Sequence, residues 1–133
     1  MAFKLLYNSE NKTEEVMNKI LILGKDSRLN DEIQHYLKTN SYEIVSLFPN
    51  EDNLSQIENI DFTNCVVLHE FPVFRNYETL ERIMRLSCSK VIFITSDYSL
   101  RFKREIAKCQ KAEVIYRPFL PKQLITSLTQ NKH

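Results

Sequence analysis

The sequence predicts an α/β fold: a doubly wound, five-stranded parallel sheet in a three-layer α/β/α sandwich. Five short apolar runs alternate with five amphipathic stretches along the chain. Three of the runs consist almost entirely of β-branched or aliphatic residues, which is typical of strands buried on both faces of a parallel sheet. Alternating β and α units of this length place helices on both faces of such a sheet.

Each predicted strand is an apolar run bounded by polar or turn-forming residues. In chain order, the strands are expected at residues 20–23, 42–48, 65–68, 91–94 and 114–116. The single glycine of the chain, Gly24, directly follows the first strand. A tight turn from strand to helix is the commoner reason for a glycine at such a position, and room for a ligand is the alternative.

Each predicted helix is an apolar stripe at helical spacing. The stripes are Leu29, Ile33, Tyr36 and Leu37; Leu54, Ile57 and Ile60, in a helix around residues 53–59; Leu80, Ile83 and Met84 with Ser87; Phe102, Ile106 and Cys109; and Leu120, Leu124, Ile125 and Leu128. Ser27 and Ser99 are expected to cap the first and fourth helices, and Pro121 fits the first turn of the last.

The composition is that of one ordinary globular domain. Of the 133 residues, 43% are hydrophobic and 26% are charged, so the chain can bury a single core. The net charge of +1 gives no reason to expect nucleic acid or an anionic membrane as a partner. No apolar run approaches the roughly 18 residues of a membrane span, and the first residues lack the layout of a signal peptide.

The cysteines and the chain ends complete this description. Cys65, Cys88 and Cys109 are odd in number and widely spaced, so free, buried thiols that fill the core are expected in a reducing compartment. No CxxC motif or Cys/His pairing suggests a metal site, no cofactor is expected, and the protein is predicted to be cytoplasmic. Residues 1–18 form a polar N-terminal extension, in which residues 3–7 could add a strand, and residues 19–130 form the domain.

Three motifs follow one another along the chain. The first strand runs straight into a helix that begins after a serine, the fourth strand ends in Ile94-Thr95-Ser96, and the fifth ends in Tyr116-Arg117-Pro118-Phe119. Taken in order, they resemble the receiver domain of bacterial response regulators, the flavodoxin-like signalling domain of two-component systems. Thr95-Ser96 is similar to the family's hydroxyl residue followed by a small one, and Arg117-Pro118-Phe119 is similar to its Lys-Pro-Phe.

The spacing of these positions strengthens the resemblance. Thr95 and Arg117 are 22 positions apart, and Gly24 and His69 are 45 apart, as are the corresponding residues of the family. The resemblance covers roughly residues 19–130 and implies a flavodoxin-like, receiver-like fold. The chain ends at His133, just past the last predicted helix. A protein of this native length is expected to act by docking, whereas in a longer protein an output domain could follow.

The resemblance also implies a chemistry, and this sequence lacks most of it. A receiver needs a phosphoacceptor aspartate after the third strand, two acids after the first strand to hold Mg²⁺, a lysine after the fifth and a hydroxyl after the fourth. Here Gly24 and Lys25 stand at the acidic positions, followed by Asp26. Counting without a gap places His69 at the acceptor position. Aligning Pro72 with the family's proline, which usually stands one residue later, places Leu68 there instead. Arg117 replaces the lysine, and Thr95 alone matches.

The sequence therefore predicts a degenerate receiver-like domain that is not an enzyme. It would act in signal transduction by phosphorylation-independent protein–protein interaction. Two alternatives remain open at this stage. One is a response regulator that is phosphorylated with Mg²⁺ on an unorthodox acid, Asp26, Glu70 or Asp97. The other is a small module that binds an anionic ligand at Gly24, Lys25 and Arg117.

The same residues can also have purely structural roles. Lys25 and Arg117 could pair with Asp26, Glu70 or Asp97. A functional hypothesis for Glu70 is that it acts as a built-in negative charge beside Arg117 and mimics an activated state. His69 and Glu70, at adjacent strand positions, point to opposite faces, which favours a polar pair at the sheet edge over a metal site. The hydroxyls of Thr95 and Ser96 are expected to satisfy local backbone groups.

The resemblance also suggests an interaction surface. Receivers dock partners and dimerise through the fourth helix, fifth strand and fifth helix. In this chain, that surface would carry Arg101, Arg104, Lys108, Glu113, Tyr116 and Lys122. A solvated helix surface is the default interpretation. The mixed charge would suit a homodimer with reciprocal salt bridges, and a protein of a signalling pathway is the other expected partner.

Overall fold

The computed structural model describes residues 19–70 and 77–130. The predicted extension at residues 1–18 lies outside this part, as does Pro72. Strands and helices alternate along the described chain. They are β1 (Lys19–Leu23), α2 (Arg28–Thr39), β2 (Glu43–Leu47), α3 (Glu51–Ile57), β3 (Phe62–His69), α4 (Tyr77–Met84), β4 (Cys88–Thr95), α5 (Leu100–Ala107), β5 (Ala112–Tyr116) and α6 (Pro121–Thr129).

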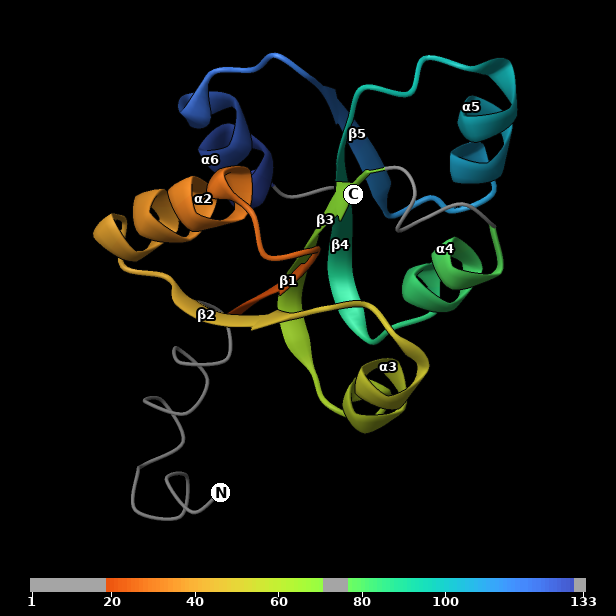
Figure 1. Ribbon diagram of the computed structural model, residues 1–133, viewed down its shortest axis with the longest axis horizontal. Helices are drawn as coiled ribbons and strands as arrows, with labels where there is room; N and C mark the ends of the chain where they lie inside the picture. The colour runs from red at the N-terminus through yellow and green to blue at the C-terminus, as the bar shows by residue number, and fades with distance from the viewer. Residues whose placement is uncertain (1–18, 71–76, 131–133) are drawn as a thin grey trace.

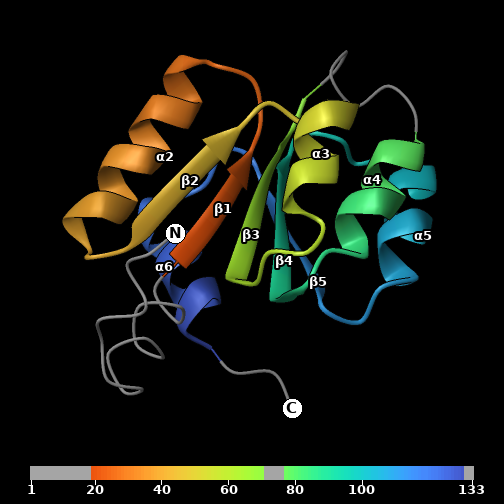
Figure 2. The ribbon, with the colours of Figure 1, turned by 90° about the horizontal axis from the view of Figure 1, so that it is seen from below.

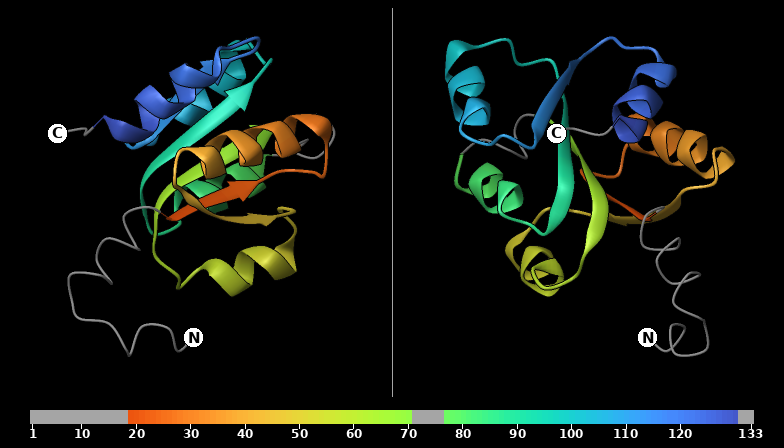
Figure 3. Two further views of the ribbon diagram at one scale, coloured as in Figure 1. Left: turned by 90° about the vertical axis from the view of Figure 1, so that its left-hand side faces the viewer. Right: turned by 180° about the vertical axis from the view of Figure 1, so that it is seen from behind.

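The five strands form one parallel sheet in the order β2-β1-β3-β4-β5. Figure 2 shows them side by side in this order. Helices α2 and α6 cover one face of the sheet, and α3, α4 and α5 cover the other (Figure 1 and the right-hand view of Figure 3). The predicted fold class, a doubly wound parallel sheet in a three-layer sandwich, is confirmed.

Each face of the sheet has its own hydrophobic core, because successive strand residues point to opposite faces. Leu21, Val67 and Phe93 pack with residues of α3, α4 and α5 on one side. Ile22, Val66 and Ile92 pack with residues of α2 and α6 on the other. The central strands are buried on both sides, which accounts for the continuous apolar runs of the sequence.

The three helix starts that the sequence marks with Ser27, Ser99 and Pro121 are correct, whereas the second helix, expected around residues 53–59, begins at Glu51. The Ser27 and Ser99 side chains accept hydrogen bonds from the backbone N–H groups of Asn30 and Phe102, and Pro121 begins α6. Asn50, which the sequence analysis did not single out, caps α3 in the same way. Within residues 19–70 and 77–130, no helix has the length and apolar character needed to cross a membrane.

Several predicted boundaries are wrong, each for a local reason. β3 and β4 begin earlier than expected, at Phe62 and Cys88, because the apolar runs mark only their central parts. Ile60 is exposed after the end of α3, and Cys109 follows the end of α5. Leu120 precedes α6 and is also exposed. An apolar side chain next to a helix therefore extended the predicted stripe without belonging to the buried face.

Candidate functional site

The carboxyl edge of the sheet brings four of the predicted site positions onto neighbouring strands. Thr95, the last residue of β4, lies between His69 of β3 and Tyr116 of β5 in the register of the sheet. Gly24 directly follows β1, and Arg117 directly follows β5. The positions that the resemblance identified are thus gathered at one edge, where open α/β sheets bind ligands.

His69 lies inside this edge, buried against the helical layer of α3, α4 and α5. Only 8% of its surface is exposed, and its ring stacks on Phe102 of α5 with 4.5 Å between centroids. Its Nδ1 lies 2.7 Å from Oγ1 of Thr95. The sequence favours a polar pair of His69 and Glu70 at the sheet edge. The structure places His69 at this edge, against the Thr95 hydroxyl and the ring of Phe102.

The Thr95 hydroxyl is fully engaged by its neighbours. Its Oγ1 accepts the backbone N–H of Asp97 at 2.9 Å, which is the local backbone bond that the sequence predicts. The hydroxyl hydrogen is then available to Nδ1 of His69, an arrangement that suits the neutral ring with its proton on Nε2. Thr95 therefore connects the end of β3 to the loop that precedes α5.

Burial lowers the pKa of His69, because a buried site disfavours the charged imidazolium; the Asp97 carboxylate opposes this shift. At Asp97 partial burial works against ionisation. Hydrogen bonds from Ser99, with a smaller electrostatic contribution from His69, outweigh this effect and lower the pKa of the Asp97 carboxyl. The structure thus keeps His69 neutral and Asp97 ionised at neutral pH.

This difference predicts a pH dependence of stability. An unfolded histidine binds a proton below about pH 6.5, whereas native His69 resists it, so the unfolded state binds more protons. The free energy of unfolding should therefore decrease as the pH falls below about 6.5. Urea titrations between pH 5 and 8 would measure it. His69→Gln should flatten this dependence, and His35→Gln, at an exposed site, should leave it unchanged. An equal slope in wild type and His69→Gln would contradict the assignment.

Gly24 allows the end of β1 to lie close to β3. A Cβ atom at this position would lie 2.8 Å from Cβ of Leu68 and 3.0 Å from its Cγ and Cδ1. The backbone of Gly24 is not in the left-handed region. The glycine is therefore required by close packing and not by a tight turn, so the expected reason is corrected. Leu68 occupies the space in which a side chain at position 24 would stand.

The two basic residues of the site have different surroundings. Nη1 of Arg117 lies 3.4 Å from Oε2 of Glu70, in an ion pair whose carboxylate side chain is only 17% exposed. Lys25 is half-buried and takes part in no ion pair within the described part of the chain. Of the acids proposed as partners for Arg117, the structure selects Glu70. Among residues 19–70 and 77–130, no cluster of His, Cys, Asp and Glu could hold a metal ion.

The predicted interaction surface is only partly available. The guanidinium of Arg101 lies over the ring of Tyr77 in α4, at 4.6 Å from its centroid, and Lys108 pairs with Glu105 at 3.1 Å. Tyr116 stacks on Tyr98 with 4.5 Å between ring centroids. These side chains therefore serve contacts within the domain as well as facing outward.

The remaining residues of that surface are two exposed cations and one half-buried acid. Arg104 and Lys122 are exposed. Glu113, in contrast, accepts a hydrogen bond from Ser127 and lies 3.6 Å from Nζ of Lys90. The mixed charge expected from the sequence is therefore reduced, because the acid is used inside the domain.

Lys90 is a structural residue that the sequence analysis missed. Its side chain is only 4% exposed, and Nζ donates to the backbone carbonyls of Ser127 and Gln130 at the end of α6. It thereby satisfies carbonyl groups that a helix end leaves unpaired. A charged residue just before the apolar run 91–94 was the available signal, and strand alternation places it on the face that α6 covers.

Comparison with known proteins supports the fold. No protein-family model matches the chain, and no curated protein sequence matches it. Among solved structures, the chain is similar to the chemotaxis response regulator CheY4 of Vibrio cholerae. The TM-score is 0.65, the sequence identity is 18%, and the match covers 84% of this chain and 96% of that one. It is also similar to a CheY-like response regulator receiver domain protein from Methanospirillum hungatei JF-1. There the TM-score is 0.69 and the identity 23%, with 84% of this chain and 90% of that one covered. The fold is therefore the flavodoxin-like fold of CheY-like receiver domains.

Proposed function

We propose that this chain is a degenerate receiver-like domain that acts in signal transduction by protein–protein interaction and does not transfer phosphoryl groups. Both similar structures are response-regulator proteins, which supports a role in signalling. The observation that carries the proposal is the pairing within the carboxyl edge: His69 holds the Thr95 hydroxyl, and Glu70 holds Arg117.

The proposal is supported first by the residues at the end of β1, which do not suit Mg²⁺. Mg²⁺ requires several oxygen ligands in near-octahedral geometry, usually with carboxylates among them. At the end of β1, the receiver-like positions hold Gly24 and Lys25, and Leu68 fills the space next to Gly24. Asp26, the nearest acid in the sequence, is exposed. This edge therefore offers a leucine and an ammonium group where a receiver would need acidic ligands.

The proposal is supported second by Thr95 and Arg117, the residues that would contact a phosphoryl group, because both already have partners. The Thr95 hydroxyl already bonds to His69 and to the backbone of Asp97. Arg117 already pairs with the Glu70 carboxylate. Glu70 thus supplies the fixed negative charge beside the cation, so the edge needs no added anion to balance Arg117. Partner binding would then depend on this one arrangement of the edge.

Incubation with acetyl phosphate and Mg²⁺, followed by intact-mass measurement, tests the proposal. We expect no phosphorylated species in the wild type. The Asp26→Asn, Glu70→Gln and Asp97→Asn variants distinguish the alternative of an unorthodox acceptor. A Mg²⁺-dependent gain in mass that one of these variants abolishes would replace the proposal with an active response regulator.

The surface formed by α5, β5 and α6 is the proposed docking surface. Its exposed side chains include the cations Arg104 and Lys122, whereas the Glu113 carboxylate pairs with Lys90 within the domain. This charge distribution favours a signalling protein with an acidic surface over a homodimer with reciprocal salt bridges, because few acids remain for the reciprocal pairs.

Light scattering and sedimentation across a wide range of protein concentrations test this choice. We expect the wild type and the Arg104→Glu/Lys122→Glu variant to remain monomeric alike. The Lys38→Glu/Arg85→Glu variant, at two exposed sites outside α5, β5 and α6, serves as the charge-matched control. If the wild type dimerises and only the double variant dissociates, the surface is a homodimer interface instead.

A further inference from the structure

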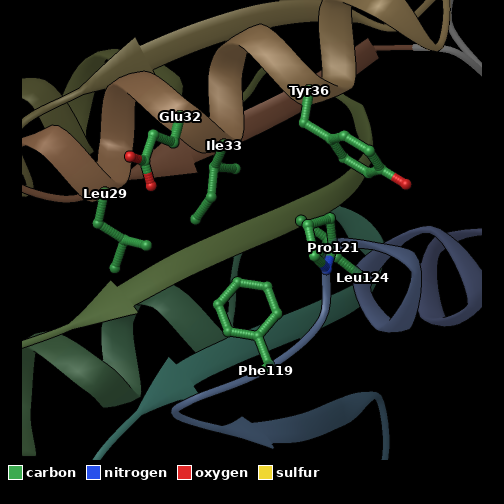
Figure 4. Close-up of a pocket in the computed structure, with 7 residues that line it drawn as sticks. All are labelled: Leu29, Glu32, Ile33, Tyr36, Phe119, Pro121 and Leu124. Carbon is green, nitrogen blue, oxygen red and sulfur yellow. The ribbon is translucent and has the colours of Figure 1, made fainter.

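A pocket lies between α2 and α6, on the sheet face opposite His69. Figure 4 shows the side chains that line it, and its volume is about 130 Å³. Leu29 and Ile33 of α2 form one wall, and Phe119, Pro121 and Leu124 form the other. Glu32 and Tyr36 are the two polar side chains at its margin.

The size of the pocket limits its occupant. Pockets for drug-sized ligands measure roughly 300–1,000 Å³, and an apolar cavity of about 150 Å³ accommodates benzene. A volume of about 130 Å³ therefore suits one six-membered ring or one branched alkyl group. The leucine, isoleucine, proline and phenylalanine side chains that line it favour such a group through apolar contact.

The negative charge of Glu32, at the margin of the pocket, favours a ligand whose polar group is a cation. Oε2 of Glu32 lies 3.2 Å from Nε of Arg28, and their side chains are 63% and 92% exposed. An ion pair as exposed as this one contributes little, so another cation can compete with Arg28 for the carboxylate. An anionic ligand would meet the Glu32 carboxylate and would be disfavoured. The second polar neighbour, Tyr36, adds an aromatic ring that also tolerates a cation.

We propose that this pocket binds a small organic ammonium ion. The ring or branched alkyl group lies between Ile33 and Phe119, and the ammonium group pairs with Glu32. The proposal does not depend on the signalling role argued above. Two residues of the pocket are nonetheless close in the sequence to the carboxyl edge of the sheet. Leu29 lies two residues after the helix cap Ser27, and Phe119 lies two residues after Arg117.

Methyl NMR titrations with three probes of similar shape test the proposal. The probes are 2-phenylethylammonium, neutral 2-phenylethanol and anionic phenylacetate. We expect saturable shifts of the Leu29, Ile33 and Leu124 methyl signals with 2-phenylethylammonium, and weaker binding of the other two. Glu32→Gln should weaken 2-phenylethylammonium binding about fivefold, the upper end for an exposed ion pair. The exposed Glu43→Gln variant on β2 should leave the binding unchanged.

A second variant tests the position of the ring. Leu29→Phe, at a half-buried site, should fill the pocket and abolish binding while the remaining methyl spectrum stays dispersed. The absence of saturable shifts in the wild type would overturn the proposal. Phenylacetate binding as tightly as 2-phenylethylammonium would also overturn it, as would unchanged binding in Glu32→Gln. These outcomes do not need the Leu29→Phe variant to fold.

Discussion

Replacing Lys90 with methionine is expected to lower the free energy of unfolding by about 3 kcal/mol, the low end for removing one partner of a buried ion pair. The substitution removes the cation that pairs with Glu113, whose side chain is 22% exposed. It also leaves the Ser127 and Gln130 carbonyls without their donor at the end of α6. Urea denaturation followed by circular dichroism would measure the loss.

Two further variants isolate this effect. Lys103→Met, on the exposed side of α5, is the matched lysine substitution and should change stability by less than about 0.5 kcal/mol. Glu113→Gln should cost less in the Lys90→Met background than in the wild type, because the two residues interact. A Lys90→Met protein as stable as Lys103→Met would show that Lys90 does not hold α6.

Replacing Gly24 with alanine is expected to have the next largest effect on stability. Overpacking of a well-packed site costs about 1–3 kcal/mol. The loss of glycine's freedom in the unfolded chain offsets about 0.4–1 kcal/mol of this. We therefore expect a net loss of about 1 kcal/mol, because the new Cβ would lie 2.8 Å from the Leu68 Cβ. The measurement is again urea denaturation.

Ser96→Ala provides the control for Gly24→Ala. Ser96 is exposed just after β4, at the same edge of the sheet, so its substitution should change stability by less than about 0.5 kcal/mol. A Gly24→Ala protein as stable as the wild type would mean that Leu68 moves away without cost. The space beside Gly24 would then be open to a side chain, contrary to the argument from close packing.

The order and type of the elements could be predicted from the sequence because both depend on local pattern. Continuous apolar runs such as residues 65–68 occur where a strand is covered on both faces, and the stripe of Ile33 and Leu37 lies on the buried side of α2. Strand starts were harder to predict. Cys88 and Lys90 belong to β4, but the polar residues beside them conceal the strand.

The contacts within the site could be predicted only in part. The ion pair of Arg117 and Glu70 was one of several pairings that the sequence allowed, and the sheet register selects it. The stacking of His69 on Phe102 could not be predicted, because it depends on how α5 packs against the sheet. The same holds for Lys90, whose carbonyl partners lie 37 and 40 residues further along the chain.

We propose that the carboxyl edge of the sheet is closed to phosphoryl chemistry by its own side chains. The most direct test is an amide NMR titration with Mg²⁺ and beryllofluoride, a mimic of the phosphoryl group. We predict no saturable shift at Thr95 or Arg117, because His69 and Glu70 already occupy these groups. A saturable, Mg²⁺-dependent shift at both residues that is lost in Asp26→Asn or Asp97→Asn would contradict the claim.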